Sequence, residues 1–217
     1  AGSFYIPYKG IKNWSWESAW IVGGVFSWII TPWVVATLLI PDAFAILKSS
    51  PVHSLLWTYL FGVLWGVGGL TYGLSMRYLG LSLGNAVALG FCAAFGTIIP
   101  PLFLGQFGGL VSSFSGAVTM SGVFVCITGI ATAGRAGMLK ERELSDEAKK
   151  STLSEFHFVK GIWIATFAGI MSSCMAFAFA AGKPIAEATM ASGVEKVWQN
   201  IPVLIVALLG GFTTNFT

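Results

Sequence analysis

The pattern of hydrophobic and polar positions along this chain consists of long apolar runs separated by shorter polar segments. Five long runs contain no charged side chain, and they cover residues 19–40, 54–76, 81–104, 116–134 and 161–181. An α-helix needs about 20 mostly apolar residues to cross roughly 30 Å of hydrocarbon. The runs are continuously apolar and lack the two-residue alternation of membrane β-strands. The sequence therefore predicts five complete membrane-spanning helices.

Two shorter apolar runs flank these spans. Residues 1–8 resemble the last turns of a helix, and residues 201–216 resemble the first turns of another. The chain has no initiator methionine and no secretory signal with a cleavage site. We therefore expect a fragment of an all-α polytopic membrane protein.

One long polar segment, residues 138–160, separates two groups of spans. Its length and mixed charge predict a solvated, helical cytoplasmic linker. Five helices precede it, counting the truncated first one, so a second half that repeats the first would lie upside down in the membrane. The strings FYIPYK (4–9) and FAFAAGK (177–183) end apolar runs with a lysine on opposite sides. Inverted repeats are typical of transporters, which bind substrate between the halves near the bilayer midplane. The predicted parts are a first repeat at 1–137, the linker at 138–160 and a second repeat starting at 161–217.

The placement of lysine and arginine predicts the orientation of the spans. Alternate connections carry nine basic residues on one side and three on the other. Basic residues concentrate in cytoplasmic loops, so the poorer side, with loops 41–53, 105–115 and 182–200, is predicted to be outside. Tryptophans near the predicted span ends fit a membrane interface; they are Trp14, Trp16, Trp20, Trp57 and Trp198.

Composition and motifs exclude several classes of function. Only 10% of the residues are charged, against about 25% in soluble domains, and the net charge of +3 is too small and dispersed for nucleic-acid binding. The three cysteines match no metal or redox spacing, and both histidines lie outside the spans. No metalloprotease, nucleophile-elbow or P-loop motif occurs. We therefore expect no enzyme, no cofactor and no bound metal.

Glycine and proline mark places where helices come close or bend. Gly62 and Gly66 lie four residues apart, a spacing that lets helix backbones approach one another in lipid. Such a face fits static packing, and it also fits helices that move against each other during transport. Pro100 and Pro101 predict either a bent helix beside a polar cavity or simply the end of a span.

Three side chains are candidates for substrate binding. Trp65 and Tyr72 lie seven residues apart and therefore share one face of a helix. They suit the apolar face of a sugar ring, with the tyrosine hydroxyl as a polar handle, although lipid-facing or core positions would explain them as well. Asn85 carries two donors and two acceptors, and burying it is costly unless another helix or a hydroxylated ligand satisfies it.

Several strings together resemble a known family. They are WSWESAW (14–20), VGGVFSWII (22–30), FGVLWG (61–66), YGLSMRYLG (72–80), RAGMLKER (135–142) and AGKP (181–184). In this combination the chain resembles the L-rhamnose–proton symporter family of the drug/metabolite transporter superfamily, along its whole length.

This resemblance implies a ten-helix protein of two inverted five-helix repeats in the bacterial inner membrane, which imports L-rhamnose with a proton. The chain would then hold the first repeat, helix six and the beginning of helix seven. Alternatives are an exporter of amino acids, nucleotide sugars or drugs with the same fold, and a membrane scaffold that transports nothing. Glu17, Glu187 and Glu195 are the candidates for proton coupling, but all three lie at span margins. We expect the principal proton site on the second half.

Overall fold

The described part of this chain is all-helical. A computed structural model describes residues 14–143 and 157–216, and within these ranges every regular element is helical. Six segments are long and apolar enough to cross a membrane: Ser18–Leu39, Val52–Gly80, Leu83–Phe103, Phe114–Leu139, Phe158–Ala181 and Lys196–Phe216. The five predicted spans are confirmed as helices of that kind. The run 201–216, expected to hold only first turns, joins the turn before it in a sixth such segment. Residues 1–8 lie outside the described residues.

The first span contains a π-helical turn in its middle. It consists of α2 (Trp16–Gly24), the π turn η1 (Val25–Ile30) and α3 (Thr31–Leu39). Pro32 is the second residue after the turn. A proline inside a helix lacks the N–H donor, and its ring clashes with the carbonyl four residues earlier. The wider π turn accommodates this, and turns of this kind are frequent at functional sites.

A glycine reverses the chain between the second and third spans. After the short helix α4 (Ala43–Ser49), α5 (Val52–Phe103) forms two arms, Val52–Gly80 and Leu83–Phe103. Gly80 has φ 79° and ψ 165°, a conformation that is essentially open to glycine alone. Pro100 and Pro101 lie in the last turn of α5, so they mark the end of the span and not a bend in its middle.

The remaining helices are α6 (Phe107–Ser112), α7 (Phe114–Glu143), α9 (Phe158–Ala181), α10 (Lys183–Ala191), the 3-10 turn η2 (Lys196–Trp198) and α11 (Ile201–Phe216). α7 and α9 extend into both ends of the predicted linker 138–160. Residues 144–156 of that linker lie outside the described residues.

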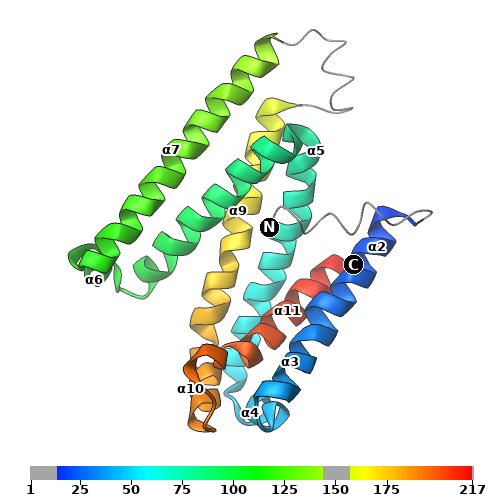
Figure 1. The fold of residues 1–217 in the computed structure, drawn as a ribbon, viewed down its shortest axis with the longest axis vertical. Helices are drawn as coiled ribbons and strands as arrows, with labels where there is room; N and C mark the ends of the chain where they lie inside the picture. Colours follow the sequence, from blue (N-terminus) through cyan, green and yellow to red (C-terminus); the bar gives the residue numbers. More distant parts are fainter. Residues whose placement is uncertain (1–13, 144–156, 217) are drawn as a thin grey trace.

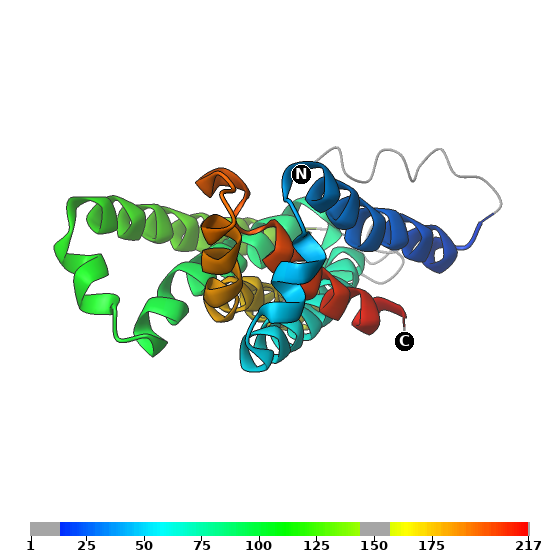
Figure 2. The same cartoon turned by 90° about the horizontal axis from the view of Figure 1, so that it is seen from below.

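α9 packs against both arms of α5 at the centre of the molecule (Figure 1). Figure 2 agrees with Figure 1 that α7 lies at one side and α2–α3 at the other. Small residues allow the close approach of α9: a Cβ on Gly169 would lie 2.9 Å from the carbonyl oxygen of Ala88. Around this contact, Val87, Ala88, Ala165 and Ala168 are buried. Glycine and alanine thus place α9 beside the inner faces of α5, as expected for helix packing in lipid.

A second close crossing joins α11 to the first arm of α5. A Cβ on Gly62 would overlap the carbonyl oxygen of Ala207, and a Cβ on Gly210 would overlap that of Tyr59. Hydrogen bonds continue the contact, because Thr214 Oγ1 donates to the Val63 carbonyl at 3.0 Å. The predicted small face around Gly62 and Gly66 is therefore a helix-packing face.

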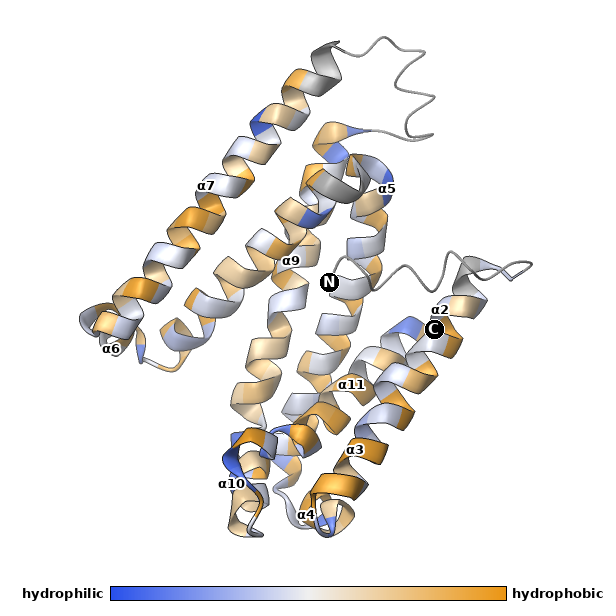
Figure 3. Ribbon diagram, in the orientation of Figure 1, coloured by the Kyte–Doolittle hydropathy of each residue, from blue (hydrophilic) through white to orange (hydrophobic). Residues whose placement is uncertain are grey.

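The two ends of the bundle differ in the connections they hold. α4 and α10, from two of the loops predicted to be outside, lie at the bottom in Figure 1, and α6, from the third, lies at the lower end of α7. The turn between the two arms of α5 and the start of α9 lie toward the upper end. The backbone N–H of His157 donates to the Tyr78 carbonyl at 3.2 Å, which joins the start of α9 to that turn. Polar residues concentrate near the helix ends (Figure 3).

Cysteine labelling tests which end faces the outside. In a cysteine-free variant of the whole protein, a cysteine at position 48 should react with a membrane-impermeant maleimide in intact cells, and a cysteine at position 145 should react only after lysis. The expectation rests on the nine-to-three distribution of basic residues. Reaction at 145 but not at 48 in intact cells would reverse the orientation.

Candidate functional site

A cavity of about 440 Å³ lies where helices from both ends of the chain meet. Its walls come from α2, η1, both arms of α5, α9 and α11, and are mostly apolar. The lining residues are Trp20, Trp28, Trp65, Gly66, Gly69, Tyr72, Leu89, Cys92, Ser172 and Asn215. Gly66 and Gly69 lie near the middle of the span Val52–Gly80, whereas Trp20 and Asn215 lie near the ends of theirs, so the cavity extends from the middle of one span to the ends of two others. None of these lining residues is charged, which suits an uncharged ligand.

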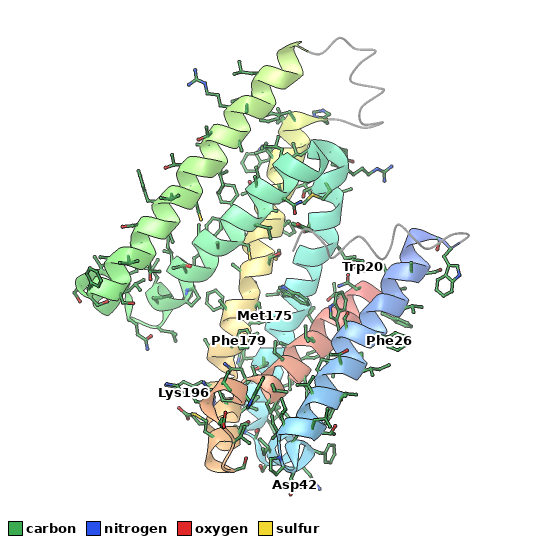
Figure 4. The ribbon with its side chains drawn as sticks, in the orientation of Figure 1. Trp20, Phe26, Asp42, Met175, Phe179 and Lys196 are labelled. Atoms are coloured by element: carbon green, nitrogen blue, oxygen red, sulfur yellow. The ribbon has the colours of Figure 1, made fainter. Side chains whose placement is uncertain are left out.

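Three tryptophans from separate elements form one aromatic wall of this cavity. Trp28 lies between Trp20 and Trp65 with centroid distances of 5.9 and 5.7 Å, and both pairs are edge-to-face. That geometry is favourable for aromatic rings. The π turn η1 carries Trp28 into the cavity, whereas its neighbour Phe26 is 58% exposed. Figure 4 shows Trp20 on the bundle side of the first span and Phe26 on the outer side.

Tyr72 and Asn85 meet across the Gly80 turn. The Tyr72 hydroxyl donates to Asn85 Oδ1, which joins the two arms of α5. Trp65 and Tyr72 both line the cavity, as their shared face predicted. Asn85 is not among the lining residues, and its geometry makes it the acceptor that orients the Tyr72 hydroxyl. Of the three residues predicted together, two therefore face the cavity and the third supports one of them.

Asn215 is a polar cavity residue that the sequence pattern did not single out. Its Oδ1 accepts a hydrogen bond from Trp20 Nε1 at 3.1 Å, and its Nδ2 donates to the carbonyls of Gly211 at 2.8 Å and Gly66 at 3.4 Å. It therefore ties α11 to both α2 and α5. Asn215 lies in the run treated as the first turns of a span, and the general rule for polar residues inside spans would have found it. Trp20 lies near the start of its span, as predicted, and it also lines the cavity.

The acidic candidates for proton coupling lie away from this cavity where they are described. Glu187 forms an ion pair with Lys183 at 3.8 Å, and both side chains are largely exposed. Glu195 is exposed just before η2. Glu17 belongs to α2, but its side chain is outside the described set. In the described ranges no cluster of three or more histidine, cysteine or acidic residues is placed to hold a metal ion.

Comparison with known proteins gives a consistent result. The family model described as L-rhamnose-proton symport protein matches residues 1–217. Curated L-rhamnose-proton symporters of Cronobacter sakazakii, Escherichia coli and Klebsiella pneumoniae are 44%, 42% and 41% identical over 215 residues. These matches cover 99% of this chain and 61% of each relative. No solved structure matches. The names of the family and of these relatives are those of transporters, in line with the expectation that the chain is not an enzyme.

Proposed function

Because this chain belongs to the L-rhamnose-proton symport protein family, we propose that the whole protein imports L-rhamnose together with a proton across the bacterial inner membrane. The chain spans 61% of the length of the relatives named above, which are called L-rhamnose-proton symporters.

The main support for a sugar substrate is the uncharged cavity with its wall of three tryptophans. Its volume of about 440 Å³ falls within the roughly 300–1,000 Å³ usual for small-ligand sites. A sugar has no charge, and its ring offers C–H groups to aromatic faces and hydroxyls to a few polar groups. Amino acids and nucleotide sugars carry charges that are costly to bury without a partner. The cavity therefore favours a sugar over these alternative substrates.

The architecture we propose has ten helices in two inverted repeats, with residues 1–137 in the first repeat, 138–160 in the linker and 161–217 in the second. Support comes from the cavity, which draws residues from α2 and α5 on one side of the linker and from α9 and α11 on the other. Transporters with inverted repeats bind substrate between the halves near the midplane.

Within the cavity we assign substrate contact to Trp65 and Tyr72, with Asn85 acting through Tyr72. Trp65 would lie against the apolar face of the sugar ring. Tyr72 would meet a sugar hydroxyl, and the hydrogen bond to Asn85 restricts the rotation of its own hydroxyl.

Uptake of radiolabelled L-rhamnose by the whole protein, in cells that lack their own carrier, tests the proposed function. Accumulation against a gradient is expected, and a protonophore should abolish the accumulation while leaving downhill exchange. Accumulation that resists the protonophore would contradict proton coupling. Absence of all L-rhamnose uptake, with the protein present in the membrane, would favour the export or scaffold alternatives.

Neutralising the marginal acidic residues should have little effect on coupling. None of the six segments able to span the membrane contains an acidic residue, and Glu187 and Glu195 are exposed. We therefore place the principal proton site in the part of the family's length that this chain does not span. Glu17→Gln, Glu187→Gln and Glu195→Gln should each keep proton-driven accumulation within about twofold of the unmodified protein, because none of the three residues belongs to a segment able to span the membrane. Loss of accumulation in one variant, with downhill exchange preserved, would assign the coupling residue to that position.

A further inference from the structure

Most hydroxyl groups in the described spans bond to their own helix. Thr71 Oγ1 donates to the Val67 carbonyl at 2.9 Å, Thr166 Oγ1 donates to Ile162 at 2.8 Å, and Ser173 Oγ donates to Ile170 at 2.6 Å. In an apolar environment such a bond satisfies the hydroxyl donor, because the preceding helical turn supplies a carbonyl oxygen. These hydroxyl groups therefore have no free donor for a ligand.

Ser172 departs from this pattern. It comes from α9, is half-buried, and lines the cavity. Its hydroxyl makes no hydrogen bond to any residue in the described part of the chain, although the carbonyl of Ala168 lies one turn earlier on the same helix. The next residue, Ser173, is buried and bonded to its own helix. Of these two adjacent serines, Ser173 uses its hydroxyl within its own helix, whereas the Ser172 hydroxyl is available to a ligand.

Three other polar side chains of the cavity, Trp20, Tyr72 and Asn215, already have hydrogen-bond partners. Tyr72 donates to Asn85, and Trp20 Nε1 donates to Asn215. Asn215 in turn donates to two backbone carbonyls. The Ser172 hydroxyl offers one donor and two acceptor positions to whatever fills the cavity.

The backbone of α9 also holds this hydroxyl at a defined place. A Cβ on Gly68 would lie 2.6 Å from the Ser172 backbone nitrogen and 2.7 Å from its Oγ, so α9 and the first arm of α5 are in close contact at this point. A side chain with one rotatable torsion on a tightly packed helix loses little entropy on binding.

We propose that Ser172 is a specificity-determining residue that hydrogen-bonds one hydroxyl of the bound sugar, while the tryptophan wall contacts the ring. This assignment rests on the proposed function, and it gives α9 a direct contact with the substrate. The sugar would then bridge α9 and the helices α2, η1 and α5 that carry the tryptophans.

The test measures L-rhamnose binding to the purified whole protein through quenching of its intrinsic tryptophan fluorescence. Ser172→Ala should raise the dissociation constant roughly 2- to 12-fold, the range for loss of one neutral hydrogen bond. Ser172→Cys keeps nearly the same volume but is only a weak donor, so a similar rise is expected. Ser173→Ala is the matched control and should bind as the unmodified protein does, because its hydroxyl is committed to Ile170.

Sugar analogues that lack the hydroxyl at carbon 2, 3 or 4 identify the partner of Ser172. One of them should bind the unmodified protein more weakly than L-rhamnose, by about the factor seen for Ser172→Ala. Ser172→Ala should not weaken the binding of that analogue further, because the analogue and the variant each remove the same hydrogen bond.

An unchanged dissociation constant for both Ser172 variants would overturn the assignment. It would also be overturned if Ser172→Ala weakened the binding of every analogue as much as it weakened the binding of L-rhamnose. The proposed function would survive either result, because the unmodified protein would still bind and accumulate L-rhamnose. Failure of the unmodified protein to bind L-rhamnose would overturn the proposed function and this inference with it.

Discussion

Gly210→Ala is expected to reduce L-rhamnose uptake to background, because the added methyl group would overlap the carbonyl oxygen of Tyr59 on the neighbouring helix. Overpacking in a core costs about 1–3 kcal/mol where side chains can move aside. Here the obstacle is backbone, so relief requires α11 to move away from α5. The hydrogen bond from Thr214 to Val63 and the contacts of Asn215 lie one turn further along the same crossing and would be lost with it.

The measurement is uptake together with thermal stability of the purified protein, followed by size-exclusion chromatography after heating. Gly122→Ala on α7 is the matched control, because a Cβ at that position would have no described atom within 4 Å apart from its chain neighbours and the backbone of its own helix. It should retain uptake and, since alanine favours helices over glycine by about 1 kcal/mol, should not lose stability. Wild-type uptake and melting temperature in Gly210→Ala would show that the helices are not held at this separation.

Asn85→Ala is expected to raise the half-saturating L-rhamnose concentration by roughly 5- to 150-fold at unchanged expression. The substitution removes the Asn85 acceptor of the Tyr72 hydroxyl, and losing one partner of a buried hydrogen bond costs about 1–3 kcal/mol, with 1.4 kcal/mol equal to tenfold. The hydroxyl would then turn to other partners, and the cavity wall would present a different polar group to the sugar.

Tyr72→Phe should weaken uptake in the same direction, and the double variant should lose less than the sum of the two single losses, because both changes remove one bond. Tyr59→Phe is the control on the same helix: its hydroxyl bonds Thr213 at 2.9 Å on the exposed side of the crossing, and sugar affinity should change little. If Trp65→Ala, Tyr72→Ala and Asn85→Ala all gave normal uptake, this wall would have no part in binding the sugar.

Part of the site could be predicted because it depends on spacing within one helix. Trp65 and Tyr72 are seven residues apart, and helical geometry alone puts them on one face. Contacts between distant segments could not be predicted in the same way. Trp20 bonds Asn215 from the other end of the chain, and no periodicity in either segment indicates that pairing. The tryptophan at position 20 fits a membrane interface equally well when its segment is considered alone.

The all-helical membrane class and the positions of the spans could be predicted from the residues alone, because a helix in hydrocarbon must satisfy its backbone internally and keep charges out. Those constraints act on each segment separately, so each span can be recognised from its own residues. Three features became known only from the folded chain: Asn85 accepts the hydrogen bond of Tyr72, the two prolines lie at the end of a span, and Ser172 lines the cavity while Ser173 is buried. Lipid surrounds every apolar face alike, and which face meets another helix depends on the close packing of glycine and alanine with distant backbone.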